Sequence, residues 1–184
     1  MKLRLILCCL LLSLGSIWAK DDVRKASEAL IKRVIPEKAA SFKVETIQAE
    51  DGKDRFEIES KGSKIILRGN NGVSVASALY HYLKYYCNAH MSWNGDNLNL
   101  PSRLPKVPEK VACPTAFDHR VYLNYCTVSY TMAWWDWERW QREIDWMAMH
   151  GINMPLAVIG QEAVWQNTLR RFKMNDDEIR TFLV

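Results

Sequence analysis

Apolar and polar positions follow two different periods in the first half of the chain. Residues 23–34 place apolar side chains at intervals of three and four, which is typical of one buried helix face, and Pro36 ends that pattern. Two later segments, 42–47 and 55–59, alternate apolar and polar residues as half-buried strands do, and 64–68 is expected as a third strand. Helical spacing returns over 73–87. The order helix, three strands, helix predicts a small α+β domain over 20–87, with antiparallel strands and helices on one face.

Residues 88–117 differ in character because asparagine and proline gather there. This composition indicates a linker or a long surface loop. Trp93 lies within the segment and admits two interpretations. Its indole either pins the loop to the body of the protein, which we favour, or contacts a ligand.

From residue 118 the pattern changes to strand, helix, strand, helix. A β-branched and aromatic strand over 120–125 precedes a helix that Asp136 caps and that runs to His150, with Gly151 in the left-handed conformation after it. Residues 152–159 form an apolar run expected of a strand buried on both faces, although Pro155 removes a ladder donor.

A second helix is predicted over 161–172, and such alternation implies parallel strands with crossover helices. A complete eight-stranded barrel needs roughly 250 residues. The segment 118–184 therefore predicts only the first βα units of a TIM-type (β/α)8 barrel, with open strand edges. We interpret the sequence as the front end of a larger protein or a truncated product.

Tryptophan is concentrated between residues 134 and 146, at positions 134, 135, 137, 140 and 146. Such a cluster suits either an aromatic core or a carbohydrate site, because sugar rings present flat C–H faces. Trp137 and Trp140 share a helical face with Ile144 and are predicted to be core. Trp134 and Trp135 fall in the loop after a strand, where they form a sugar platform or simply close the core. The other face of the helix is predicted to be exposed, with Trp146 and the pairs Glu138–Arg142 and Arg139–Glu143 on it.

The first nineteen residues have the features of a secretory signal. Lys2 and Arg4 precede an apolar run over 5–14, and Ala19 supplies the small residue before a cleavage site. The run is too short for a membrane anchor, which needs about 20 residues. We therefore predict a secreted or periplasmic protein from which residues 1–19 are removed.

Removal of that segment lowers the formal charge from +4 to +2, since it carries two cations and no acid. This bias is too weak to suggest nucleic acid or an anionic membrane as a partner. Cys87, Cys113 and Cys126 remain, an odd number, so at least one thiol is free or pairs elsewhere. Their spacing and that of the histidines match no metal site, and no cofactor is predicted.

Polar residues follow both predicted parallel strands at their carboxyl ends. Asn124 and Cys126 end the first strand, Tyr130 follows them, and Gln161 and Glu162 come after the second. Because the carboxyl ends of parallel strands lie on one side, these groups can converge on one ligand. The alternatives are a turn-forming asparagine, a buried inert thiol and a glutamate favoured by the helix dipole.

Five segments of the second half resemble glycoside hydrolase family 89, the α-N-acetylglucosaminidases: 122–130, 134–137, 142–148, 151–153 and 160–166. The resemblance implies an N-terminal α/β domain, a (β/α)8 catalytic barrel and a helical C-terminal domain. It implies removal of terminal α-linked N-acetylglucosamine with retention of configuration, using one carboxyl group as nucleophile and one as acid/base. By the same resemblance both catalytic glutamates lie past Val184. Asn124 and Cys126 match sugar-contacting positions, and Tyr130 matches a position near them.

The sequence thus predicts the N-terminal part of an exported retaining exo-glycosidase, inactive by itself, with Asn124, Cys126, Tyr130 and Glu162 as substrate-binding candidates. Its partner would be a glycan that contains N-acetylglucosamine. The alternatives are a carbohydrate-binding or adhesion module without catalysis, and an exported scaffold fragment without a ligand.

Overall fold

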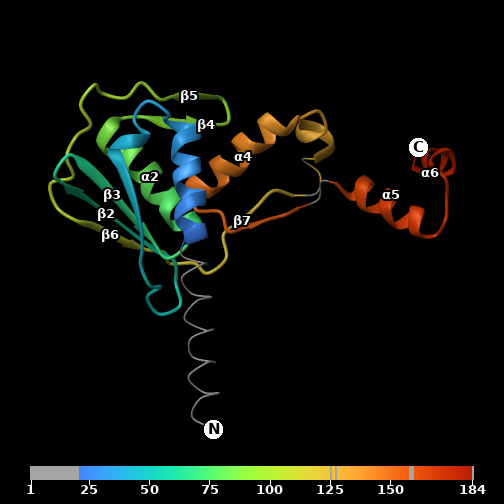
Figure 1. Ribbon diagram of the computed structural model, residues 1–184, viewed down its shortest axis with the longest axis horizontal. Coiled ribbons are helices and arrows are strands. Elements are labelled where there is room, and N and C mark those ends of the chain that lie inside the picture. Colours follow the sequence, from blue (N-terminus) through green and yellow to red (C-terminus); the bar gives the residue numbers. More distant parts are fainter. Residues whose placement is uncertain (1–20, 125, 127, 158–159, 184) are drawn as a thin grey trace, which may run out of the picture.

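The computed structural model describes residues 21–124, 126, 128–157 and 160–183 (Figure 1). The predicted signal segment lies outside the described residues. A mixed sheet with the strand order β1-β3-β2-β6 forms the body of the first half. The strands are β1 (Phe42–Thr46), β2 (Arg55–Lys61), β3 (Lys64–Gly69) and β6 (Val111–Pro114).

The three strands predicted in the first half are confirmed, but their pairing is not wholly antiparallel. β2 and β3 form an antiparallel hairpin through Gly62, whose φ is +62°. β1 pairs with the free edge of β3 and not with β2. Since the chain reverses direction between β1 and β2 and again between β2 and β3, β1 and β3 run parallel. The segment 88–117, expected as a linker or loop, contains β4 (His90–Ser92), β5 (Gly95–Asn97) and β6. Since β6 pairs with β2, this segment completes the sheet.

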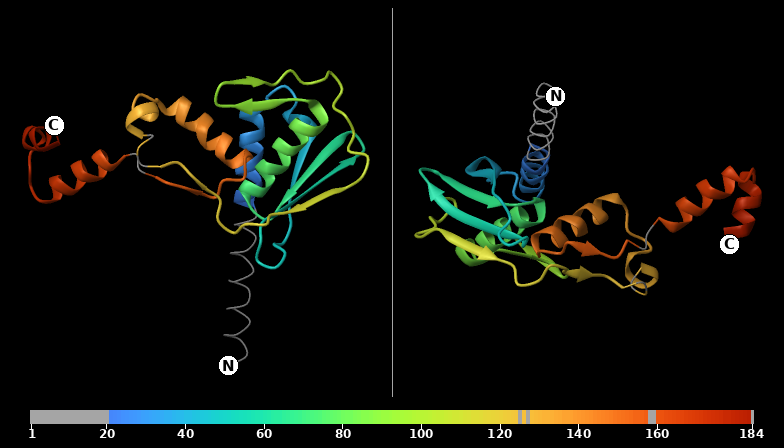
Figure 2. Two further views of the ribbon diagram at one scale, coloured as in Figure 1. Left: turned by 180° about the vertical axis from the view of Figure 1, so that it is seen from behind. Right: turned by 90° about the horizontal axis from the view of Figure 1, so that it is seen from below.

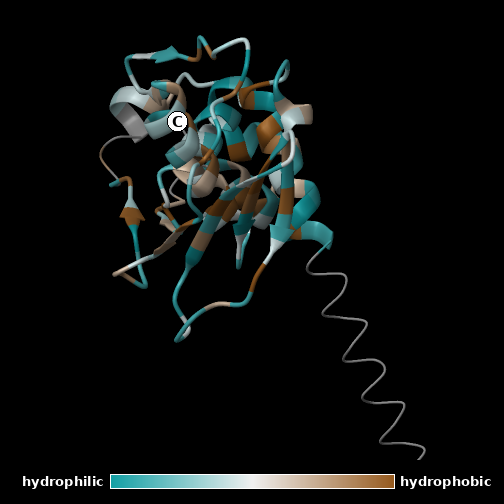
Figure 3. Ribbon diagram, turned by 90° about the vertical axis from the view of Figure 1, so that its left-hand side faces the viewer, coloured by the Kyte–Doolittle hydropathy of each residue, from teal (hydrophilic) through white to brown (hydrophobic). Residues whose placement is uncertain are grey.

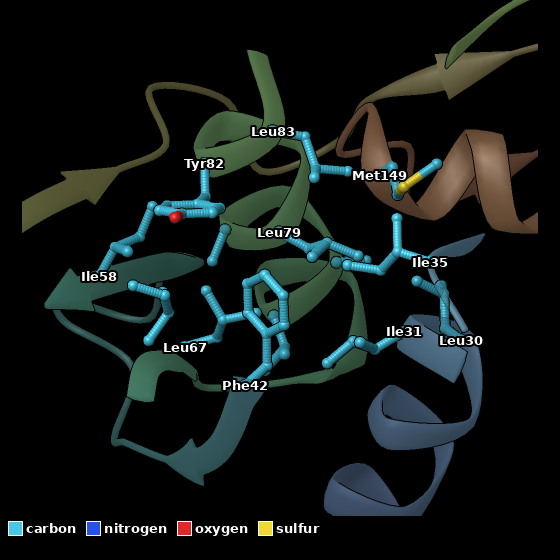
Figure 4. Packing of buried hydrophobic residues seen from close by; sticks show 14 of the residues in the cluster. Leu30, Ile31, Ile35, Phe42, Ile58, Leu67, Leu79, Tyr82, Leu83 and Met149 are labelled. Carbon is cyan, nitrogen blue, oxygen red and sulfur yellow. The ribbon is translucent and has the colours of Figure 1, made fainter. Parts of the chain in front are cut away.

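Two helices cover one face of this sheet (Figures 1 and 2). The first spans residues 21–34, and the second is α2 (Gly72–Cys87). Between the helices and the strands lies a continuous apolar core (Figure 4), which includes Leu30, Ile31, Ile35, Phe42, Ile58, Leu67, Leu79, Tyr82, Leu83 and Met149. Figure 3 shows hydrophobic segments gathered in the sheet and these helices. The core is the main stabilising feature, because removal of one such side chain to alanine costs about 2–5 kcal/mol.

The start of α2 is defined by two local features. The side chain of Asn71 caps the helix by accepting a 2.9 Å hydrogen bond from the backbone N–H of Ser74. Gly69, at the end of β3, leaves no room for a side chain, since a Cβ there would lie 2.6 Å from the backbone nitrogen of Val75. The close approach of strand and helix therefore requires glycine at this position.

The second half contains a parallel strand pair with a crossover helix, as predicted. β7 (Val121–Tyr122) pairs with β8 (Met154–Pro155), and α4 (Trp137–Met149) connects them after the turn of η2 (Val128–Met132). Asp136 caps α4, as expected, through a 2.9 Å hydrogen bond from the Arg139 backbone N–H. Gly151 follows with a φ of +77°, which confirms the left-handed helix end. The described residues form no closed barrel.

The prediction of a strand buried on both faces over 152–159 is wrong for the residues that are described. β8 contains only two residues, and the side chains of Met154 and Leu156 are 44% and 43% exposed. In the described part of the chain β7 is the one strand that pairs with β8, so the other edge of β8 is open, and the exposure of Met154 and Leu156 shows that no layer covers these side chains. Residues 158 and 159 lie outside the described residues.

The chain continues into α5 (Gln161–Arg171) and α6 (Asp176–Leu183), which extend away from the remainder of the protein (Figures 1 and 2). A single turn, η1 (Ala39–Ser41), precedes β1. Within the described ranges, the structure holds no helix with the length and apolarity needed to cross a membrane.

The two halves are joined by ion pairs as well as by packing of α4 against α2. Arg33, on the first helix, donates two hydrogen bonds of 2.7 and 2.6 Å to the carboxylate of Asp145 on α4. At the other side, Arg120 pairs with Asp54 and donates a 2.6 Å hydrogen bond to the carbonyl of Gly151. These contacts set the direction in which β7 leaves the first half.

Candidate functional site

The turn that follows β7 carries two of the predicted site residues. The Oδ1 atom of Asn124 accepts a 2.9 Å hydrogen bond from the backbone N–H of Cys126, and both side chains are exposed. Leu123, directly before them, has a φ of +73°, a conformation that costs a residue other than glycine roughly 1–3 kcal/mol. Strained backbone of this kind is concentrated at functional sites. The turn therefore holds Asn124 in a defined orientation at the carboxyl end of a parallel strand.

The other two predicted residues lie on separate elements. Tyr130 belongs to η2, and its side chain is 84% exposed. Glu162 lies in the first turn of α5, a helix with no buried residue, and its side chain forms no hydrogen bond within the described part of the chain. The first-turn position is also where the helix dipole favours a carboxylate. The structure thus brings Asn124 and Cys126 together in one turn, and it places Tyr130 and Glu162 on two other elements, with both side chains in solvent.

A buried carboxylate supports this end of the strand pair. Glu143 is fully buried and accepts hydrogen bonds from the Trp93 indole, at 2.9 Å, and from the Arg139 guanidinium, at 3.0 Å. The sequence predicted that Glu143 forms an exposed ion pair with Arg139. The ion pair is present, but the prediction that Glu143 is exposed is wrong. Burial, with the negative charge of Glu143 as the next cause, raises the pKa of Tyr122 to about 12. Trp93 thus ties the segment 88–117 to α4, which agrees with the interpretation that we favoured for it.

Arginine and tryptophan side chains stack beside that carboxylate. The Arg139 guanidinium lies 3.7 Å from the centroid of the Trp135 ring, within the range of a cation–π interaction. Trp135 meets Trp140 edge to face at 4.9 Å and Trp93 at 5.8 Å. Trp135 therefore closes an aromatic cluster over α4. The sequence does not signal that Trp93 and Glu143 are partners, because they lie about fifty residues apart in the chain.

The helix α4 does not bury the face that its apolar residues predict. Trp137 is 69% exposed and Ile144 is 46% exposed, so the assignment of Trp137 to the core is wrong. Trp146, predicted on the exposed face, packs between Tyr122 at 5.2 Å and His150 at 4.2 Å. Its indole N–H is buried without a hydrogen-bond partner among the described residues. The buried residues of α4 lie on two sides of the helix, Glu143 and Met147 on one and Asp145 and Met149 on the other, and so they do not follow the single apolar stripe that the spacing predicts.

Exposed aromatic side chains follow the turn after β7 in the chain. Trp134 is 92% exposed, and it precedes Trp137 and follows Tyr130 in the chain. Exposed indoles of this kind are available to stack on sugar rings.

Thiols and metal ligands are the remaining candidate groups. Cys87 is buried, whereas Cys113 and Cys126 are exposed, and all three are free thiols. Burial raises the pKa of the Cys87 thiol, which suits an unreactive core residue. Among the described residues no group of histidine, cysteine, aspartate and glutamate side chains is arranged to hold a metal ion.

Two protein-family models match the chain. The model described as "Alpha-N-acetylglucosaminidase (NAGLU) N-terminal domain" matches residues 25–106, and "Alpha-N-acetylglucosaminidase (NAGLU) tim-barrel domain" matches residues 120–184. The human α-N-acetylglucosaminidase is 41% identical over 171 residues, which span 89% of this chain and 23% of the human protein. The chain thus spans about a quarter of that relative's length.

Solved structures of a bacterial relative show the same fold. The family 89 glycoside hydrolase from Clostridium perfringens, in complex with 2-acetamido-1,2-dideoxynojirimycin, superposes with a TM-score of 0.82 at 41% identity. The match covers 89% of this chain and 19% of that one. A variant of the same bacterial protein, with two glutamates changed to glutamine, was solved with its substrate GlcNAc-α-1,4-galactose and matches equally well.

A small α+β domain followed by parallel βα units is the arrangement that this chain shares with the family 89 glycoside hydrolase from Clostridium perfringens. More particularly, the chain belongs to the α-N-acetylglucosaminidase family, glycoside hydrolase family 89. It corresponds to the N-terminal domain and the first part of the TIM-barrel domain of its relatives.

Proposed function

We propose that this chain is the N-terminal part of an exported retaining exo-glycosidase that removes terminal α-linked N-acetylglucosamine from glycans. The observation that carries the proposal is the turn after β7. It presents Asn124 and Cys126 to solvent at the carboxyl end of a parallel pair, the end at which barrel enzymes bind ligands. Support comes from the relatives, one of which was solved with a substrate that carries α-linked N-acetylglucosamine.

In the proposed site this chain supplies substrate contacts and no catalytic carboxylate. Asn124 and Cys126 contact the N-acetylglucosamine, and Tyr130 and Glu162 complete one side of the pocket. The nucleophile and the acid/base are two carboxyl groups that belong to later barrel strands. We therefore expect the 184-residue chain to show no turnover of a chromogenic α-N-acetylglucosaminide. Appreciable turnover by a sample free of other glycosidases would contradict this placement.

The contact by Asn124 is tested in the longer protein that contains the barrel. Asn124→Asp keeps the oxygen that accepts the Cys126 N–H and removes the amide donor, whereas Asn124→Ala removes both. Loss of one hydrogen bond to the sugar costs about 1–3 kcal/mol, and the expected drop in kcat/KM is therefore about ten- to a hundredfold for both variants.

The thermal midpoint should change little, since the turn is exposed. Cys126→Ser is the companion variant, because it keeps the size of the side chain and changes its polarity. Wild-type kcat/KM in all three variants would remove these residues from the site.

Export is a separate part of the proposal. It rests on Lys2, Arg4, the apolar run 5–14 and Ala19. The secreted protein should begin at Lys20 when its N-terminus is sequenced. Residues 1–19 still attached to the exported protein would contradict a cleaved signal.

A second candidate function, carbohydrate binding without catalysis, is favoured by the exposure of Trp134 and Trp137. It predicts that the 184-residue chain binds GlcNAc-α-1,4-galactose and that Trp134→Ala abolishes binding. Titration calorimetry with the chain alone separates the two functions, because an incomplete glycosidase pocket should bind the disaccharide weakly or not at all.

A further inference from the structure

A cleft of about 380 Å³ lies at one end of the sheet in the first half of the chain. Four cationic side chains line it, those of Lys38, Lys64, Arg103 and Lys106. Four serines lie between them, Ser41, Ser60, Ser63 and Ser102. Among the described residues, no aspartate or glutamate lines it, and we refer to this feature as the basic cleft.

The basic cleft is far along the sheet from the contact with the second half. It is built where β2 ends and β3 begins, on either side of the turn at Gly62. The opposite end of the same two strands carries Asp54, which pairs with Arg120 ahead of β7. A ligand in the basic cleft would therefore occupy a place separate from the candidate sugar site.

The cations of the cleft have no carboxylate partner within the described part of the chain. Lys38 donates a 2.7 Å hydrogen bond to the carbonyl of Ser102, and Lys64 donates to the carbonyl of Ala40. The side chains of Arg103 and Lys106 are exposed and form no hydrogen bond among the described residues. Lys38 and Lys64 are thus held by backbone carbonyls, whereas Arg103 and Lys106 have no hydrogen-bond partner in the described part of the chain.

Arginines elsewhere on the same sheet form ion pairs with carboxylates. Arg68 pairs with Glu45 at 2.8 Å and with Glu59 at 2.6 Å, and Arg55 pairs with Glu50 at 2.7 Å. Carboxylates therefore neutralise Arg55 and Arg68, whereas no carboxylate among the described residues pairs with the cations of the cleft. Like charges that share a concave surface raise its positive potential, and an anion that enters relieves their repulsion.

We propose that the basic cleft binds oxyanion groups, sulfate, phosphate or carboxylate, carried on a saccharide. Arg103 and Lys106 supply the free cationic donors, and the serine hydroxyls supply neutral donors that also suit sugar hydroxyls. The volume accommodates a monosaccharide with its charged substituent. No aromatic side chain of the described part of the chain lines the cleft, so nucleic-acid bases would find no ring there on which to stack.

The test uses the full chain and titration calorimetry at low ionic strength. Galactose-6-sulfate is the probe, galactose is its uncharged counterpart, and sodium sulfate and sodium phosphate are the free ions. The variant Arg103→Gln/Lys106→Gln removes the two unengaged cations. Lys53→Gln is the matched control, because Lys53 is an exposed lysine without an ion pair at the opposite end of the sheet.

We expect galactose-6-sulfate to bind and galactose not to bind. Each lost cation should weaken the binding by about two- to fivefold, so the double variant loses about four- to twenty-five-fold, while Lys53→Gln binds as the wild type does. Added salt should weaken binding to the wild type more than to the double variant.

The arms of the experiment also distinguish the source of the oxyanion. Equal affinity for free sulfate and galactose-6-sulfate would support an oxyanion cleft and assign it to the free ion. The proposal is overturned if no charged probe binds, if the double variant binds as tightly as the wild type, or if Lys53→Gln loses as much affinity. Tighter binding of a single-stranded oligonucleotide than of the sulfated sugar would overturn it as well.

Discussion

Removal of the buried carboxylate of Glu143 should destabilise the start of the barrel more than any exposed change on the same helix. Glu143→Ala leaves the Trp93 indole N–H and the Arg139 guanidinium without their shared acceptor. A buried donor left unsatisfied costs about 1–3 kcal/mol. Loss of one partner of a fully buried ion pair costs about 3–5 kcal/mol.

The Arg139 side chain is 26% exposed, so water replaces part of the lost interaction and the lower part of that range applies. We therefore expect Glu143→Ala to lower the free energy of unfolding by about 2–4 kcal/mol. Glu143→Gln keeps the size and one acceptor oxygen while removing the charge. It should cost less, about 1–2 kcal/mol, because the bond from Trp93 survives and only the attraction to Arg139 is lost.

The assay is urea denaturation followed by tryptophan fluorescence and near-ultraviolet circular dichroism. Both signals report on Trp93 and Trp135, which contact each other and Arg139. Glu138→Ala, an exposed glutamate on the same helix, is the control and should change stability by less than about 0.5 kcal/mol. If Glu143→Ala were as stable as this control, the buried network would not support the strand pair as argued.

Three further predictions concern single groups. Gly69→Ala should lower the free energy of unfolding by about 1–3 kcal/mol in urea denaturation, since its Cβ would lie 2.6 Å from the Val75 nitrogen; wild-type stability would contradict the close approach. The raised pKa of Tyr122, about 12, means that the folded state holds the phenol proton more tightly than the unfolded state, whose pKa is about 10. Stability should therefore fall as pH rises from 10 toward 12, and Tyr122→Phe should flatten this fall; an unchanged slope would refute it. Burial lowers the pKa of His150, so the unfolded state binds its proton first, and stability should decline as pH drops below the ordinary value of 6.5. Urea midpoints measured across pH should show a smaller acid decline in His150→Gln, and an equal decline would contradict the burial argument.

Local features of the fold could be predicted from the sequence because they depend on neighbours a few residues apart. The period of apolar residues marked the first helix, α2 and the strands β1 to β3. Asp136 as the cap of α4 and Gly151 as its left-handed end followed from backbone chemistry alone.

The candidate site was predictable in part. Alternation of strand and helix indicated parallel pairing, which places the residues after β7 and β8 on one side of the pair. Asn124 and Cys126 do meet in one turn. That Tyr130 and Glu162 join them at one ligand stays a prediction, because both side chains lie in solvent on elements of their own.

Tertiary packing decided which face of α4 is buried. The sequence places Trp137, Trp140 and Ile144 on an apolar stripe, yet Trp137 is exposed and Glu143, predicted on the other face, is fully buried. The reason is that Glu143 meets an indole donor from residue 93 and an arginine on its own helix, so its burial is compensated by hydrogen bonds that no local pattern encodes.

The sequence by itself thus determined the first helix, α2, the strands β1 to β3, the two ends of α4 and the class of the second half, since these depend on short-range periodicity and backbone conformation. Only the tertiary structure decided that β1 lies parallel to β3, that β6 completes the sheet from within a proline-rich segment, and that four unpaired cations share one cleft. Each of these rests on contacts between residues far apart in the chain, where a side chain's environment depends on which surfaces meet and not on its neighbours in sequence.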